Sequence, residues 1–126
     1  MRWLTISGPR GLQLRCGVPE RPPERMRGLL SREAIEVDEA LLIPDATSLH
    51  TFAMGFPILV ARLDDSLGVV DARRVMPYRL VMPMRNARHV LECHRDVDLR
   101  PGDVLRVDGE LKIRAVRRSR PARSFR

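Results

Sequence analysis

The chain has 126 residues, of which 44% are hydrophobic, and a formal net charge of +7. This length suits one domain with a single core, and the apolar content excludes a chain that is disordered by composition. No apolar run is long enough to cross a bilayer and the N-terminus lacks the apolar stretch of a secretory signal, so we predict a cytoplasmic protein without a transmembrane segment.

The N-terminal third predicts a hairpin followed by a short helix. Trp3–Ile6 is strand-like, "SGPRG" is a turn, and Leu12 and Leu14 alternate with polar residues, which is typical of a second strand. In residues 22–30, two prolines precede apolar residues spaced three and four apart, which favours an amphipathic helix of two to three turns.

The remainder of the chain predicts short strands. They are expected at residues 40–43, 49–54, 58–63, from 69 onward, at 78–82 and at 87–94. Asp108–Gly109 lies between two alternating arms, the pattern of a type I′ hairpin. We therefore predict a mainly β fold, a compact antiparallel sandwich or small barrel of about eight short strands with one short helix.

The charge divides the chain into two parts. All 16 acidic residues lie in residues 1–111, where they balance 16 of the 23 basic residues, so residues 112–126 carry the whole excess. We expect a single β domain over residues 1–116 and a basic, disordered tail over residues 117–126. Such a tail can make a weak contact with nucleic acid or an anionic surface, although it is more commonly a solvated chain end.

The segment "SLHTFAMGFP", residues 48–57, holds the most unusual residues. In a strand, His50, Phe52 and Met54 would share one face. A histidine between large apolar neighbours is commonly a core residue, and the functional alternative places it at the rim of a pocket walled by Met54. The spacing of His50 and Met54 is a weak signal for a soft metal, so we predict neither a metal nor a cofactor.

Two further groups of residues could carry chemistry. Glu92 and His94 share a strand face, where such a pair is commonly solvent-exposed. Cys16 and Cys93 suit free thiols, and a single disulfide between them stays open as an alternative. The sequence holds no phosphate loop, nucleophile elbow or paired-cysteine motif, so we predict no catalytic residue.

Two blocks, "RGLL" at residues 27–30 and "LHTFAMGFPILVARLD" at residues 49–64, resemble the bacterial and archaeal family known as domain of unknown function 192. The segments "PYRLV", "HVLE" and "LRPGDVL" follow in the expected order, and the resemblance covers most of residues 10–108. It implies a mostly β domain with one short helix and no established activity. The matching motif positions are Arg27, Gly28, Leu29, His50, Thr51, Met54, Asp64 and Glu92.

Three positions depart from the family pattern. The chain has Ala46 where relatives often have cysteine, Gly55 where they tend to have a basic residue, and Leu59 where they often have aspartate. Each departure removes a polar or reactive group, so any family chemistry through these positions would be missing here. Many relatives carry signal peptides, and an exported role is not carried over.

Three functions follow as hypotheses. The favoured one is a non-catalytic module that binds a small molecule or a protein segment, with Arg27, His50, Thr51 and Met54 around one hollow and Asp64 and Glu92 as further binding residues. The second is a metal-assisted or acid–base enzyme that uses His50 with Asp64 or Glu92. The third is attachment to nucleic acid or an anionic surface through the arginine-rich tail.

Overall fold

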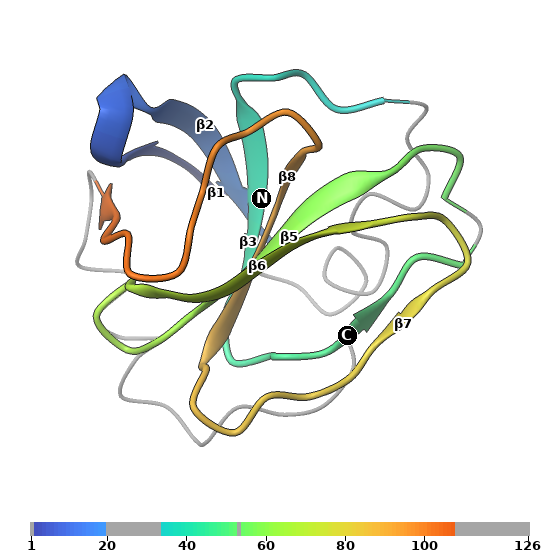
Figure 1. Ribbon diagram of the computed structural model, residues 1–126. Coiled ribbons are helices and arrows are strands. Elements are labelled where there is room, and N and C mark those ends of the chain that lie inside the picture. The colour runs from blue at the N-terminus through green and yellow to red at the C-terminus, as the bar shows by residue number, and fades with distance from the viewer. Residues whose placement is uncertain (1, 20–33, 53, 108–126) are drawn as a thin grey trace.

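The computed structural model describes residues 2–19, 34–52 and 54–107, and strands dominate it (Figure 1). The helical structure in these ranges is one 3-10 turn, η1 (Pro9–Gly11), so none of it has the length and hydropathy of a membrane-spanning helix. The strands are β1 (Arg2–Ser7), β2 (Gln13–Val18), β3 (Glu39–Ile43), β4 (Leu49–His50), β5 (Ile58–Leu63), β6 (Val69–Val75), β7 (Leu80–Val81), β8 (His89–His94) and β9 (Arg106–Val107).

The strands form two sheets. Seven of them make one sheet in the order β6-β5-β8-β3-β2-β1-β9, and β4 pairs with β7 in a separate antiparallel ribbon. Neighbours in the large sheet are antiparallel except for β2 and β3, which run parallel. Twist accumulates across these strands, so the sheet curls into a half-barrel (Figure 1). The prediction of a mainly β fold is confirmed.

The predicted hairpins are present where the sequence alternates. β1 and β2 pair in register from Arg2 opposite Val18 to Ser7 opposite Gln13, and β5 pairs with β6 through the turn after Leu63. The predicted helix at residues 22–30 and the second arm of the Asp108–Gly109 hairpin lie outside the described residues. The first arm of that hairpin, β9, pairs with β1 at the sheet edge.

Both faces of the central strands are buried. In β3, Ala40 and Leu42 point into one apolar cluster, the first core, while Leu41 and Ile43 point into another, the second core. The first core is completed by side chains of the 95–105 loop, and the second is covered by the β4–β7 ribbon. This two-sided burial explains why residues 40–43 of β3 are continuously apolar rather than alternating.

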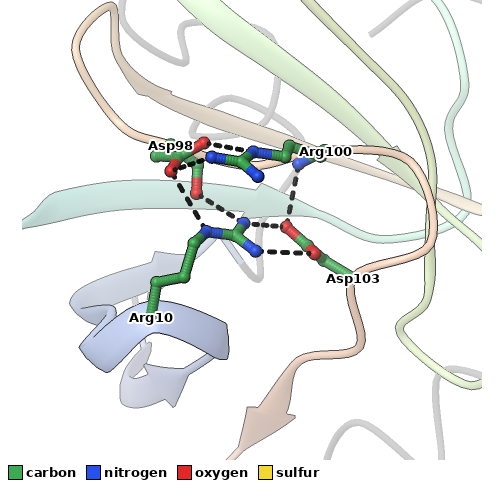
Figure 2. A network of polar contacts seen from close by, with 4 residues as sticks. All are labelled: Arg10, Asp98, Arg100 and Asp103. Carbon is green, nitrogen blue, oxygen red and sulfur yellow. Dashed lines mark hydrogen bonds and ion pairs between the residues drawn. The ribbon is translucent and has the colours of Figure 1, made fainter.

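Figure 2 shows an exposed ion-pair network between η1, which connects β1 and β2, and the loop that follows β8. Arg10 donates to Asp98 at 3.1 Å and also to Asp103, and Arg100 donates to Asp98 at 3.0 Å through both Nε and Nη2. The hydrogen bond from Arg100 lowers the pKa of Asp98, and the hydrogen bond from Arg10 lowers that of Asp103. The network fastens the β1–β2 turn to the loop that fills the first core.

Candidate functional site

The ribbon formed by β4 and β7 is organised around Thr51. Its hydroxyl donates to the carbonyl of Met76 at 2.7 Å and accepts the Arg79 amide at 2.8 Å. Its own amide donates to the Arg79 carbonyl, and its carbonyl accepts the Tyr78 amide, both at 2.9 Å. Thr51 is fully buried, so these bonds join the two halves of the ribbon and leave no hydroxyl surface for a ligand.

The predicted strand over residues 49–54 is wrong beyond His50. β4 ends there, and the chain turns so that the Met54 amide donates to the Thr51 carbonyl at 3.2 Å. The bonds from Thr51 to residues 76–79 force this turn, because they fix its backbone against the second segment of the ribbon. The expected shared face of His50, Phe52 and Met54 is therefore broken: Met54 is 1% exposed in the second core, while Phe52 is 48% exposed.

His50 lies at the boundary between core and surface. Its ring stacks on Phe52 with centroids 5.2 Å apart, and it is half-buried opposite Leu80. Its Nδ1 is shielded from solvent and has no hydrogen-bond partner within the described ranges. An imidazole in this setting contributes chiefly its flat apolar face.

The outer side of the ribbon is apolar. Leu49 and Val81 form one cross-strand pair and point into the second core. Side chains alternate along a strand, so the adjacent pair, His50 and Leu80, points outward. Five large apolar side chains within or next to β4 and β7 are 48% to 66% exposed, and we name them the ribbon face: Phe52, Met76, Tyr78, Leu80 and Met82. Soluble proteins seldom leave several large apolar side chains together on one surface unless that surface binds something.

A buried cation fixes the ribbon to the sheet. Arg62 of β5 is 2% exposed and donates to Asp71 Oδ2 of β6 at 2.7 Å. The same guanidinium donates to the carbonyls of Thr47 and Met82, one on each segment of the ribbon. Partial burial raises the pKa of Asp71, but the hydrogen bond and charge of Arg62 outweigh it and the net pKa is lowered. Arg62 therefore sets the position of the ribbon face.

Asp64, a predicted binding residue, shapes a turn. Its carboxylate accepts the amides of Ser66 at 2.9 Å and Gly68 at 2.8 Å, closing the β5–β6 connection. A side chain at Gly68 would meet the carboxylate at 3.0 Å, so glycine allows this close approach. Asp64 borders an open polar hollow of about 760 Å³ that is also lined by Arg85 and Arg88 and does not include His50.

Glu92 is fully buried, which contradicts the expectation of a solvent-exposed Glu92–His94 pair. It lies in β8 directly between Leu41 of β3 and Val60 of β5, on the face that carries the second core. His94 is at the sheet end, where its Nδ1 accepts the Asp96 amide at 3.0 Å. Glu92 is buried because β8 runs through the middle of the sheet, which the sequence of one strand does not reveal.

The residues proposed for catalysis are not assembled within the described ranges. His50 makes no hydrogen bond there to Asp64 or Glu92, and no group of three or more His, Cys, Asp or Glu side chains is placed to hold a metal ion. Arg27 and the basic tail at residues 117–126 lie outside the described residues. Their predicted roles therefore stay predictions.

The two cysteines are free thiols buried in the first core. Cys16 of β2 and Cys93 of β8 both pair with Ala40 of β3, so two strand spacings, about 9.6 Å, separate their backbones. A disulfide needs Cα atoms within about 7 Å, so this pairing excludes the bridge. Burial raises the pKa of Cys16 to about 12, and burial also raises the pKa of Cys93 well above its ordinary value.

Sequence reasoning missed most of the ribbon face. The sequence predicts an ordinary strand over residues 78–82, although Tyr78, Leu80 and Met82 recur at period two on the side opposite to the buried Val81. Arg62 was also missed. An arginine inside an otherwise apolar strand, "ILVARL", is the signal that was available for it.

Comparison with known proteins places the chain in a family. The sequence model of DUF192, described as an uncharacterized ACR family, matches residues 4–107. The chain belongs to the DUF192 family. A UPF0127 protein from Thermococcus sibiricus (strain DSM 12597 / MM 739) is 33% identical over 73 residues. That match takes in 55% of this chain and 47% of the relative, so it spans about half of the relative's length.

Solved structures show the same fold at low identity. A protein of unknown function from Novosphingobium aromaticivorans DSM 12444 has a similar fold, with a TM-score of 0.70, 18% identity and coverage of 82% of this chain and 83% of that one. A protein from Sinorhizobium meliloti 1021, described as a candidate transcription regulator, has a TM-score of 0.70, 17% identity and coverage of 83% and 92%. These likenesses establish the fold alone.

Proposed function

We propose that this DUF192 chain is a non-catalytic module that binds a protein segment on its ribbon face. The observation that carries the proposal is the exposure, by 48% to 66%, of five large apolar side chains in the β4–β7 ribbon and the residues next to its strands: Phe52, Met76, Tyr78, Leu80 and Met82. Burying aromatic and methionine side chains of this kind is the main source of affinity in peptide-binding surfaces.

The backbone that carries the ribbon face is held in place by buried hydrogen bonds, which favours a binding surface over side chains that are exposed by chance. Thr51 joins the two segments of the ribbon, and Arg62 fixes both segments to the sheet. The backbone that carries the exposed apolar side chains is therefore ordered before any partner binds. A surface that is ordered before it binds loses less conformational entropy when it does so. His50 stacks on Phe52 and adds a flat, half-buried ring to the same surface.

The test is a selection of displayed random peptides on the immobilised chain. We expect enrichment of peptides with several apolar or aromatic residues, and binding that weakens at least tenfold in the variant Phe52→Ser/Leu80→Ser. The His50→Ala variant should weaken binding less, because it removes the support of one ring. Affinities are measured with synthetic copies of the enriched peptides by isothermal titration calorimetry.

A matched control distinguishes binding at the ribbon face from nonspecific adsorption of peptides to exposed apolar side chains. Val37 and Val104 are each 58% exposed and lie outside the ribbon, so Val37→Ser/Val104→Ser removes a comparable apolar surface elsewhere. This variant should bind like the wild type. Absence of any enriched peptide, or equal weakening in both double variants with unchanged circular dichroism, would overturn the proposal.

A further inference from the structure

We propose that the polar hollow beside the β5–β6 turn binds a small zwitterion, a molecule with both an ammonium and a carboxylate group, such as a free amino acid. None of the ribbon-face residues lines this hollow, so the site lies beyond the proposed function. Its volume of about 760 Å³ falls in the range of roughly 300 to 1,000 Å³ that is typical of small-molecule sites. The turn after β5 and the loop between β7 and β8 supply its polar lining: Asp64, Asp65, Ser66, Arg85, Asn86 and Arg88.

The turn after β5 contributes two carboxylates to the hollow. Both hydrogen bonds that shape this turn go to Oδ1 of Asp64, while its Oδ2 accepts none from the described residues and is not shielded from solvent. The side chain of Asp65 is 67% exposed, and its contact with Arg88 is long, at 3.7 Å. This part of the lining therefore presents negative charge to the hollow.

The loop between β7 and β8 contributes one arginine whose charge the protein does not match. Arg85 is exposed, and its side chain makes no ion pair or hydrogen bond with a described residue. Arg88, in contrast, is 17% exposed and donates to Asp45 at 2.8 Å, so its charge is already matched. The side chains of Ser66 and Asn86 are also exposed and make no hydrogen bond in the described ranges, which leaves them for a polar ligand.

The presence of both signs of charge in one hollow selects the class of ligand. A simple anion would be attracted by Arg85 and repelled by Asp64 and Asp65, and a simple cation would meet the reverse. A zwitterion directs its carboxylate to the guanidinium, which binds carboxylates in a forked geometry, and its ammonium to the aspartates, so both contacts are attractive. Because Arg85 forms no ion pair with either aspartate, the ligand does not have to break one.

The segments that line the hollow are held in place by the fold. The Met84 amide donates to Thr47 Oγ1 at 3.2 Å, and the Arg88 amide donates to the Leu63 carbonyl at 2.7 Å. These bonds attach the β7–β8 loop to the residue before β4 and to the end of β5, next to the turn that Asp64 closes. A ligand therefore does not have to order the loops, which lowers the entropic cost of binding.

The experiment is a titration of the ¹⁵N-labelled chain followed by NMR at low salt. The zwitterions are glutamine and a series of increasing charge separation, namely glycine, β-alanine, 4-aminobutyrate and 6-aminohexanoate. The controls with one charge are butylamine and butyrate. We expect at least one zwitterion to bind about tenfold more tightly than either control, with the largest shifts at the amides of residues 64–66 and 84–88. The preference should shrink as salt is raised.

Variants locate the two contacts. Arg85→Gln should reduce the affinity for the best zwitterion to that for butylamine, because only the ammonium contact remains. Asp65→Asn should weaken binding by about two- to fivefold, because one of the two carboxylates remains. The controls Arg95→Gln and Asp38→Asn make the same charge changes at exposed residues that do not line the hollow, and they should bind like the wild type.

Four results would overturn the inference: equal affinity for zwitterions and controls, shifts that map away from the hollow, no saturable shift with any compound, or an equal loss of affinity in Arg85→Gln and Arg95→Gln. The last result would mean that net charge alone is responsible. The ribbon face is tested separately, because Phe52→Ser/Leu80→Ser should leave zwitterion binding unchanged and Arg85→Gln should leave peptide binding unchanged. Failure of the hollow therefore leaves the proposed function standing.

Discussion

The guanidinium of Arg62 lies against the carboxylate of Asp71, with Nη2 at 2.7 Å and Nε at 3.2 Å from the same Oδ2 oxygen. The two residues are directly opposite each other on β5 and β6, so the pairing of the strands brings the two side chains together. Because the other end of the guanidinium reaches the carbonyls of Thr47 and Met82, one buried cation couples the half-barrel to the ribbon.

Replacement of Arg62 should be costly. We expect Arg62→Met to lower the free energy of unfolding by about 2 to 4 kcal/mol, because it removes the buried donor to two carbonyls and leaves the Asp71 carboxylate with the exposed Arg73 alone. The control is Arg73→Met, which removes a 53% exposed partner of the same carboxylate and should cost about 0.5 kcal/mol or less. Urea unfolding measures both, and equal losses would contradict the central role of Arg62.

Asp71 should contribute to the acid sensitivity of the protein. Its folded pKa lies below that of the unfolded chain, so its stabilising effect is present above about pH 4 and disappears as the pH falls through the folded value. We expect Asp71→Asn to be less stable than the wild type at neutral pH, with a gap that narrows on acidification. Urea midpoints measured across this window would contradict the assignment if the gap stayed constant.

Thr51 offers a test of how the ribbon is held. Thr51→Val keeps the shape but removes the hydroxyl, which leaves the Arg79 amide and the Met76 carbonyl without that partner at a cost of about 1 to 3 kcal/mol. Thr51→Ser retains the hydroxyl and should cost less. Hydrogen exchange of the Arg79 amide should accelerate in the valine variant, and unchanged protection in that variant would show that the hydroxyl does not hold the ribbon.

The cysteines should be chemically silent in the folded protein. Burial raises the pKa of Cys16 to about 12 and also raises the pKa of Cys93, so little thiolate is present near neutral pH. Both side chains are also buried, so a thiol reagent in solution cannot reach them. Ellman's reagent should react with neither thiol in the native protein and with both in denaturant. Ser66→Cys, at an exposed position, is the positive control. Rapid reaction of a native cysteine would contradict the buried placement.

Much of the β-structure followed from local pattern. Alternation in residues 12–15, the hairpin over residues 58–75 and the apolar run at Ala40–Ile43 each predicted a strand that the structure contains. Side-chain alternation and turn residues act within a few positions, so one strand or hairpin is enough to reveal them. The family resemblance likewise depended on short blocks that are read directly from the chain.

The site was less predictable from the same sequence. Thr51, Met54 and Glu92 were expected near a binding surface, and the structure buries all three. Burial depends on which strands become neighbours: Glu92 is enclosed because β8 lies between β3 and β5, and Met54 because the chain turns after Thr51. These contacts join residues far apart in the chain, so no local pattern encodes them.

The sequence by itself determined the mainly β character, the hairpins and the family, because these depend on periodicity, turn chemistry and short motifs. Only the tertiary structure decided which polar side chains are buried and hold elements together, and which apolar side chains remain exposed on the surface. Leu80 and Val81 make the difference clear: adjacent apolar residues of one strand, they lie on opposite sides of the ribbon, with Val81 3% and Leu80 50% exposed. The sheet beneath covers one side only, and that coverage is a property of the folded whole.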